Sequence, residues 1–216
     1  RQMCIRDSSK TEHLTSEGYF TYLKEFKGGH SLNAVAGYSY FEKNGENFNA
    51  ENYDFGVEGL KYWDLESGSY LTDGKAKMGS KKDITERLFA LYARANYSYN
   101  DKYMVTATIR HEGSSKFAAE NRWGNFWALS GGWRVSGEEF MKEFDWVNDL
   151  KIRFGYGVTG NNDFDASYMA NTLSRDQYWM LPSGSWAFVY GPSSNVNPYL
   201  GWEEKKEWNI GVDYSF

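Results

Sequence analysis

Hydrophobic and polar residues alternate with a period of two along most of the second half of the chain. In 102–112 one set of alternate positions is largely apolar and the other largely polar: Tyr103, Val105, Ala107 and Ile109 against Met104, Thr106, Thr108 and Arg110. Successive side chains of a strand point to opposite faces of a sheet, so this pattern predicts strands. The strands expected are 87–99, 102–112, 126–135, 150–159 and 208–216, with weaker patterns in 18–27 and 31–43.

The predicted strands are long for a water-soluble protein. They run for about 9–13 residues, whereas soluble strands usually have about 5–6 and a tilted membrane strand needs about 9–11. Aromatic residues also stand near the strand ends, as in the interfacial girdles of membrane barrels: Tyr97, Tyr99, Tyr103, Trp127, Trp208, Tyr214 and Phe216. The pattern therefore predicts an all-β protein, an antiparallel transmembrane β-barrel of which this chain supplies about seven strands.

The connections between the predicted strands alternate in length. Residues 27–30 and 100–101 read as tight turns, whereas 44–86 and 160–207 are very long and 113–125 is intermediate. Short turns at one end and long loops at the other are typical of outer-membrane barrels, whose long loops are extracellular. The connection 136–149 is longer than a tight turn, and the apolar spacing around Phe140 and Phe144 predicts a brief helix within it.

Composition agrees with a barrel and narrows the function. Aromatic residues make up 19% of the 216 residues, and 22 glycines with only 3 prolines favour strands. The mean hydropathy of −0.70 and the lack of a long apolar run argue against a helical membrane protein, but a barrel averages out as polar. A net charge of −5 without a basic block makes nucleic acid an unexpected partner, and the single Cys4 excludes an internal disulfide.

The first eight residues, RQMCIRDS, differ from the rest. They resemble a translated sequencing-adapter scar of the kind found at the ends of assembled fragments. We therefore set residues 1–8 aside and expect one barrel region over 9–216.

Residues 110–141, RHEGSSKFAAENRWGNFWALSGGWRVSGEEFM, resemble the barrel signature of SusC/RagA-like TonB-dependent outer-membrane transporters. That signature typically reads Arg-x-Asp-Gly-Ser-Ser-x-Phe, then Arg-Trp-Gly-x-Phe, then Ser-x-Gly-Trp. The segments ANYSYNDKYMVTATIR (95–110), LKIRFGYGVTGNND (150–163) and NPYLGWEEKKEWNIGVDYSF (197–216) agree with the same family in order and spacing. Glu112, Ala118 and Trp127 depart from the residues usual at their positions, which leaves the subfamily open.

The resemblance implies a 22-stranded barrel with an N-terminal plug, energised through TonB and capped by a SusD-like surface lipoprotein. Such pairs import glycans and in some cases peptides across the outer membrane of Gram-negative bacteria. About seven strands cannot close such a barrel. We therefore expect an internal fragment that forms barrel wall and external loops, without catalytic activity and without a cofactor.

Aromatic residues in the long loops are the candidates for binding substrate: Tyr62, Trp63, Tyr178, Trp179 and Trp186. A flat ring can stack on the apolar face of a sugar; packing within the loop or against the lipoprotein is the alternative. Five basic residues are expected on the lumen face of the barrel: Arg94, Arg110, Arg134, Lys151 and Arg153. These residues either steer an anionic substrate, or pair with acids of the plug or stay solvated.

Other motifs favour structural readings. The run from Gly155 to Gly160 fits GxGxxG, but no helix is expected after it, so a nucleotide site is not predicted. Oxygen-rich side chains at 161–165 suit calcium, yet the spacing of a calcium loop is incomplete and a solvated loop is favoured. The three histidines form no metal motif. Two alternatives to a glycan importer stay open: a TonB-dependent siderophore or peptide receptor, and a secreted carbohydrate-binding β-sandwich.

Overall fold

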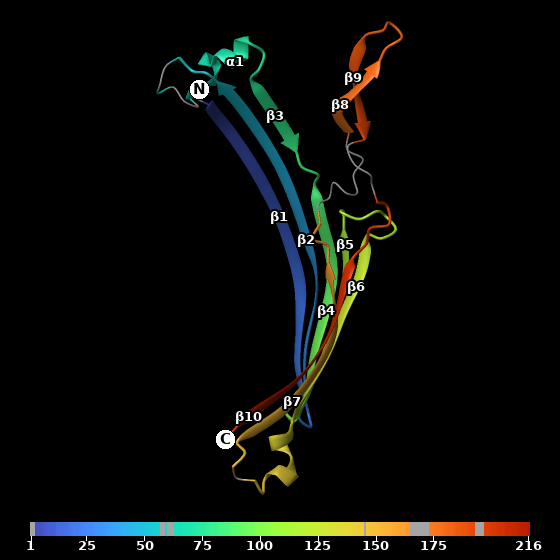
Figure 1. The fold of residues 1–216 in the computed structure, drawn as a ribbon. Coiled ribbons are helices and arrows are strands. Elements are labelled where there is room, and N and C mark those ends of the chain that lie inside the picture. The colour runs from blue at the N-terminus through green and yellow to red at the C-terminus, as the bar shows by residue number, and fades with distance from the viewer. Residues whose placement is uncertain (1–2, 57–58, 60–62, 145, 165–172, 193–196) are drawn as a thin grey trace. The chain divides into compact units, whose positions relative to one another are not determined.

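The computed structural model describes residues 3–56, 59, 63–144, 146–164, 173–192 and 197–216. Its main element is an antiparallel sheet in which the strands lie in chain order (Figure 1). The path through it is β1 (Met3–Phe26), β2 (His30–Tyr53), β4 (Glu86–Tyr99), β5 (Tyr103–Ser114), β6 (Trp123–Arg134), β7 (Asp149–Asn161) and β10 (Glu203–Ser215). All seven predicted strands are present, which confirms the all-β antiparallel class and a partial barrel wall.

The chain divides into two compact units. The first comprises Arg1–Leu14 and Glu42–Glu86, and the second comprises Thr15–Phe41 and Arg87–Phe216. In the first unit, β3 (Lys77–Lys82) pairs with β2 from Glu46 opposite Lys82 to Glu51 opposite Lys77. The same unit holds a 3₁₀ turn, η2 (Leu65–Ser67), and a short helix, α1 (Ser69–Thr72). The long connection 44–86 therefore contains structure of its own.

The first strand is more than twice, and the second nearly twice, as long as predicted. β1 and β2 each have 24 residues. β1 begins at Met3, so it runs through most of the segment that the sequence analysis sets aside. The origin of residues 1–8 stays a prediction, because a regular strand does not reveal where its coding sequence came from.

The tight turns are fixed by residues that accept a positive φ. Gly28 and Gly29 have φ of 90° and 82°, and Asn100 and Asp101 have φ of 50° and 54°. Positive φ at both central residues is the signature of a type I′ turn, whose twist matches that of the strands it joins. The two turns are also bonded to each other, since the Asn100 amide donates to the Gly29 carbonyl oxygen at 2.7 Å.

The connection between β6 and β7 corrects the prediction of a brief helix. It contains two 3₁₀ turns of three residues, η3 (Val135–Gly137) and η4 (Glu139–Met141), and no α-helix among its described residues. A helix nucleus is costly and is usually repaid by burying an apolar face. Phe140 and Phe144 stay 57% and 44% exposed, so that gain is absent here.

Glu138 fastens this connection to the sheet. Its carboxylate accepts hydrogen bonds from the Tyr103 hydroxyl at 2.6 Å, the Trp133 indole at 3.2 Å and the Lys102 ammonium at 3.3 Å. The bonds from Tyr103 and Trp133 favour the charged form most and hold the pKa of Glu138 below its ordinary value of 4.5. The ionised carboxylate therefore stabilises the folded connection more than the protonated carboxyl does.

We expect this contribution to disappear in acid. A carboxylate whose pKa is lower in the folded state adds stability above its unfolded pKa and loses it as the pH falls through the folded value. Glu138→Gln should therefore destabilise the protein at neutral pH and flatten the loss of stability below pH 4.5. Urea unfolding at a series of pH values measures this, and Glu143→Gln, at an exposed position of the same connection, is the control. Equal pH dependence in the parent and in Glu138→Gln would contradict the assignment.

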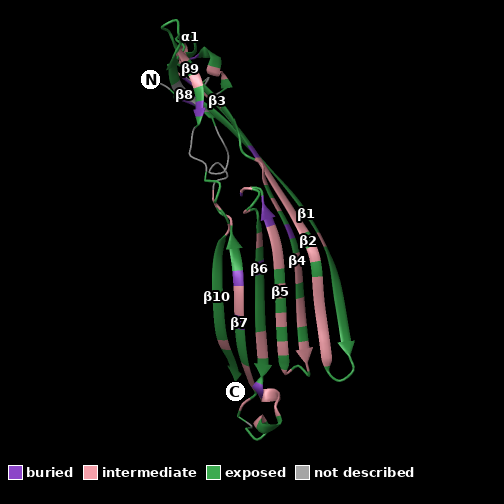
Figure 2. Cartoon of the chain, turned by 90° about the vertical axis from the view of Figure 1, so that its right-hand side faces the viewer, coloured by how far each residue is buried: buried purple, intermediate pink, exposed green. Residues whose placement is uncertain are grey.

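The sheet has almost no core. Among the described residues, the buried hydrophobic side chains are Cys4, Ala90, Phe117, Phe126, Val135 and Val158. Figure 2 shows the strands coloured mainly as exposed or intermediate. A β-sandwich needs two sheets packed face to face. Because only a small two-stranded hairpin accompanies the main sheet in the described residues, the β-sandwich alternative is wrong. No described helix is long and apolar enough to cross a membrane.

Candidate functional site

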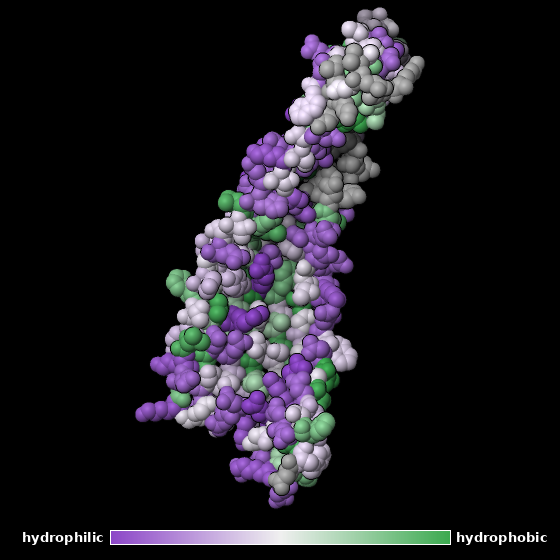
Figure 3. Space-filling view, turned by 90° about the vertical axis from the view of Figure 1, so that its left-hand side faces the viewer, coloured by the Kyte–Doolittle hydropathy of each residue, from purple (hydrophilic) through white to green (hydrophobic). Residues whose placement is uncertain are grey.

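The strand registers separate the sheet into an apolar and a polar face. Ala95 faces Ala107, which faces Leu129, which faces Tyr156, and the next position along this face carries Ile210 opposite Phe154. The positions between them carry the polar set, from Asn96 and Thr106 to Ser130, Gly155 and Asn209. Figure 3 shows hydrophilic groups standing among apolar ones on one side of the molecule. The registers of four strand pairs therefore confirm the predicted alternation of apolar and polar faces.

All five basic candidates lie on the polar face, and most have partners within this chain. Arg110 makes two bonds to Glu112, at 2.8 and 3.0 Å, and Arg153 bonds Asp213 at 2.8 Å. Arg134 pairs with Asp149 at 3.3 Å, and Arg94 donates to the Thr108 hydroxyl at 3.3 Å. Lys151 lies opposite Arg134 in the register. Acids of the same sheet, which the sequence analysis did not consider, thus neutralise part of this charge.

The loop aromatics divide between two faces of a hairpin. This hairpin, β8 (Leu173–Met180) and β9 (Trp186–Pro192), lies in the connection between β7 and β10. Tyr178 faces Phe188 and Met180 faces Trp186, so these four side chains share one face. The Tyr178 and Phe188 rings have centroids 4.4 Å apart. Trp179, which faces Ala187, belongs to the opposite face.

The shared face of β8 and β9 is open to solvent. Tyr178 is 58% exposed, Trp186 67% and Phe188 52%. The turn that presents it is tight, because the Leu181 amide donates to the Ser185 carbonyl oxygen at 2.8 Å and Gly184 has a φ of 79°. We call Tyr178, Met180, Trp186 and Phe188 the hairpin face. The sequence analysis did not include Phe188 and Met180 among the candidates. Each lies two residues from a candidate, Trp186 and Tyr178 respectively, and side chains two residues apart in a strand share a face.

Of the remaining two aromatic candidates, Trp63 lies in the other unit. Trp63 precedes η2 and is 73% exposed. Tyr62 lies outside the described residues.

A cluster of aromatic rings occupies the end of the sheet that carries the long connections. Phe117 comes from the β5–β6 connection, Phe126 from β6, Phe164 from beyond β7, and Trp202 from just before β10. Trp202 has its ring centroid 5.1 Å from those of both Phe117 and Phe126, and Phe117 lies 5.1 Å from Phe164. We call these four residues the rim cluster. Phe117 is 2% exposed and Phe126 7%, so two of the four rings of the rim cluster are buried.

Polar bonds hold the backbone around the rim cluster. The Trp202 indole donates to the Arg122 carbonyl oxygen at 3.0 Å, and the Lys116 ammonium donates to the Phe164 carbonyl oxygen at 2.9 Å. The Asn162 amide donates to the hydroxyl of Ser114, which is 1% exposed. The signature segment therefore joins the ends of β5, β6, β7 and β10. The sequence resemblance identified the segment but gave no role to its residues.

The oxygen-rich segment 161–165 is engaged in local bonds. Asn161 donates to Glu203 at 2.9 Å and accepts a bond from the Asp163 amide at 2.9 Å. Asp165 lies outside the described residues. Among the residues that the structure describes, no group of three or more His, Cys, Asp or Glu is arranged to hold a metal. The GxGxxG run lies within β7, in agreement with the strand reading.

Comparison with known proteins identifies the family. Residues 6–216 match the model of the TonB dependent receptor-like β-barrel. The TonB-dependent receptor P39 of Formosa agariphila is 34% identical over 210 residues, covering 93% of this chain and 18% of that protein. The TonB-dependent receptor SusC of Bacteroides thetaiotaomicron is 33% identical over 146 residues, covering 67% of this chain and 15% of SusC.

A solved structure agrees in fold. The structure of the RagAB peptide importer in its closed-closed state superposes with a TM-score of 0.76 at 23% identity, covering 98% of this chain and 22% of that chain. This chain thus spans less than a quarter of the length of these relatives. The likeness confirms the barrel wall that the two-faced sheet indicated, and with the match over residues 6–216 it establishes that the chain belongs to the TonB-dependent receptor-like β-barrel family.

Proposed function

We propose that this chain forms barrel wall and external loops of an outer-membrane importer of oligosaccharides. The apolar face of the sheet contacts lipid and the polar face, with its five basic residues, lines the lumen. Energy comes from TonB acting on a plug that belongs to another part of the protein, and a SusD-like surface lipoprotein delivers the ligand. Barrels of this type have an apolar outer band and a polar interior, which fits the two faces of this sheet.

The hairpin face is the observation that carries the substrate class. Tyr178 and Trp186 present flat rings on one side of a hairpin in a long connection, where barrel proteins place extracellular loops. Aromatic side chains combine a broad apolar surface with a polar edge, and they contribute large contact area with few rotatable bonds. A sugar ring offers the matching apolar face, with hydroxyls around its edge.

Peptides are the second candidate substrate. RagAB is a peptide importer by its description, and its structure shares the fold of this chain. An exposed aromatic face also suits apolar side chains of a peptide. The pairing of Arg110, Arg134 and Arg153 with acids of the sheet gives no preference for an anionic substrate.

Binding by the hairpin face is testable with a matched pair of tryptophans. Trp186 and Trp179 are both 67% exposed but lie on opposite faces. In the protein that carries this chain, Trp186→Ala and Tyr178→Ala are expected to weaken binding about tenfold or more, as central aromatic contacts do. Trp179→Ala should bind like the parent. An oligosaccharide array and a tryptic digest of casein, applied to purified protein, measure this.

The two probes separate the outcomes. Retention of peptides but of no oligosaccharide would replace the glycan proposal by peptide import. Equal loss in Trp179→Ala and Trp186→Ala would refute the hairpin face as a ligand surface.

A further inference from the structure

We propose that the apolar face of the sheet holds one phospholipid, with an acyl chain in a groove floored by alanines and the phosphate beside Lys24. The proposal rests on the proposed function, because it takes the apolar face as lipid-facing. The proposed function requires only that this face contact the bilayer. The further step is that one phospholipid molecule stays bound at a specific site formed by named residues.

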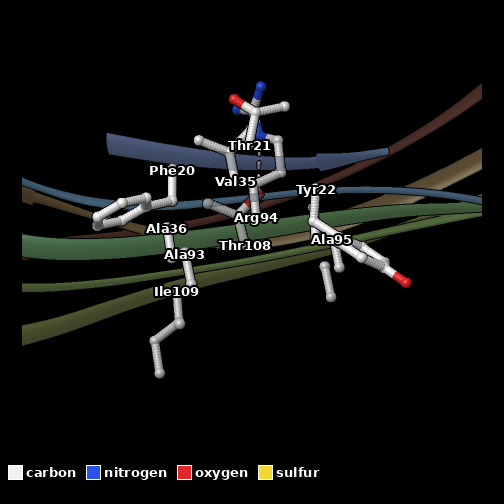
Figure 4. A pocket seen from close by; sticks show the side chains of 12 residues that line it. Phe20, Thr21, Tyr22, Val35, Ala36, Ala93, Arg94, Ala95, Thr108 and Ile109 are labelled. Carbon is white, nitrogen blue, oxygen red and sulfur yellow. Dashed lines mark hydrogen bonds between the residues drawn. The ribbon is translucent and has the colours of Figure 1, made fainter. Parts of the chain in front are cut away.

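The groove lies across β1, β2, β4 and β5, and its volume is about 610 Å³. Its floor is formed by small side chains: Ala34, Ala36, Ala93, Ala95 and Ala107. Phe20 and Tyr22 on β1 stand along one side, and Ile109 on β5 stands along the other. Figure 4 shows Phe20, Tyr22 and Ile109 projecting to one side of the strands, and Arg94 projecting to the other. The groove therefore opens on the apolar face, from which Phe20, Tyr22 and Ile109 project.

The shape suits a flexible hydrocarbon chain. Alanine leaves the backbone accessible, so that a chain lying on the floor contacts the strands directly while the larger residues enclose its sides. Each contact between carbon atoms gains only about 0.1–0.2 kcal/mol, but an enclosed chain makes many of them. The rims are exposed, with Phe20 at 87% and Ile109 at 53%, so no other described part of the chain covers the groove.

An aromatic belt lies at the short-turn end of the groove, on the same face. His30 stacks on Tyr99 with ring centroids 4.5 Å apart and forms a hydrogen bond with the Tyr97 hydroxyl at 2.6 Å, and Tyr99 stacks on Tyr103 with centroids 6.3 Å apart. Such belts mark the level of the lipid headgroups. The alanine floor begins next to this belt, since Ala95 is two residues from Tyr97 on the same face of β4. A lipid with its head at the belt thus lays its chain along the groove.

A cation stands at the headgroup level. Lys24 follows Tyr22 by two residues in β1, so it lies on the apolar face about 7 Å further along the strand. Its ammonium lies 5.6 Å from the centre of the Phe26 ring, close to the turn between β1 and β2. A lysine on an otherwise apolar face at the membrane surface is complementary to a lipid phosphate. Short turns of these barrels are periplasmic, so the occupant is a phospholipid of the periplasmic leaflet.

The test counts phospholipids that stay bound to the protein carrying this chain. The protein is purified from membranes in detergent and analysed by native mass spectrometry, with lipid identified after extraction. Ala95→Phe fills the groove and is expected to abolish the bound phospholipid. Lys24→Gln should weaken its retention about fivefold, since one cation near an anionic headgroup contributes about 1 kcal/mol.

Two control variants match these changes elsewhere. Val212→Phe adds bulk at a 63% exposed position of β10 on the same face, and Lys151→Gln removes a cation at the same end of the sheet on the polar face. Both should keep the lipid. Retention of lipid in Ala95→Phe, or equal retention in Lys24→Gln and the parent, would overturn the proposal.

Two further outcomes are distinguished by the same preparation. The groove could instead bind a second copy of the chain or another protein. If such a partner copurified with the parent and was lost in Ala95→Phe, the phospholipid proposal would also be overturned. Absence of the parent protein from the outer-membrane fraction would refute the proposed function itself, whereas a membrane-inserted protein without bound phospholipid refutes only this inference.

Discussion

Phe117→Ala is expected to lower the free energy of unfolding by about 3–5 kcal/mol, the usual range for removing a buried phenylalanine. The ring is 2% exposed and contacts Phe164 and Trp202 in the rim cluster. Few other apolar side chains of the sheet are buried, so few can move into the cavity that the substitution leaves. The loss should therefore lie toward the upper part of that range.

Urea unfolding of the protein that carries this chain, followed by tryptophan fluorescence, measures the change. Phe140→Ala is the control, since Phe140 is 57% exposed in the β6–β7 connection. It should change stability by no more than about 0.5 kcal/mol, as surface substitutions usually do. Similar losses in the two variants would show that the rim cluster is not a core.

Gly160→Ala should also destabilise the protein, by about 1–3 kcal/mol, because it overfills a packed site. A Cβ at Gly160 would overlap the ring of Phe126, and a Cβ at Gly124 would meet the same ring. Phe126 is 7% exposed and lies against Trp202, so its ring has little room to move aside. The two glycines thus form the slot into which the ring of Phe126 fits.

Gly131→Ala provides the matched control within the same sheet. The nearest atom to its added Cβ is the Met104 carbonyl oxygen at 3.9 Å, an ordinary contact. Alanine there is expected to be neutral or to stabilise by up to about 1 kcal/mol, since it restricts the unfolded chain. If Gly160→Ala proved as mild as Gly131→Ala, the rim cluster would be looser than its burial indicates.

The rim cluster gives a physical account of the signature segment 110–141. Its recurring Phe and Trp-Gly elements correspond here to a buried ring at Phe117, a ring slot at Gly124 and a ring at Phe126. These residues join strand ends. The signature segment thus stabilises the barrel wall by holding the ends of its strands together.

The sequence by itself determined the class of fold, the seven strands of the sheet and the side on which each strand residue lies. It did so because the alternation of side chains along a strand is a local property, fixed by the backbone and independent of what the strand packs against. The same alternation put Arg94, Arg110, Arg134, Lys151 and Arg153 on one face. The tight turns were also readable, since Gly28, Gly29, Asn100 and Asp101 are residue types that accept a positive φ.

Only the tertiary structure decided which distant residues meet. Asp213 neutralises Arg153, and Trp202 packs on Phe117 and Phe126, because the register brings together segments about 60–85 residues apart in the chain, and no local pattern encodes that register. The connection 136–149 formed two 3₁₀ turns because Phe140 and Phe144 stay 57% and 44% exposed, so no buried apolar face stabilises an α-helix there. The pairing of β8 with β9 likewise separated Trp179 from Tyr178 and Trp186, since neighbours along a strand point to opposite faces while partners across it share one.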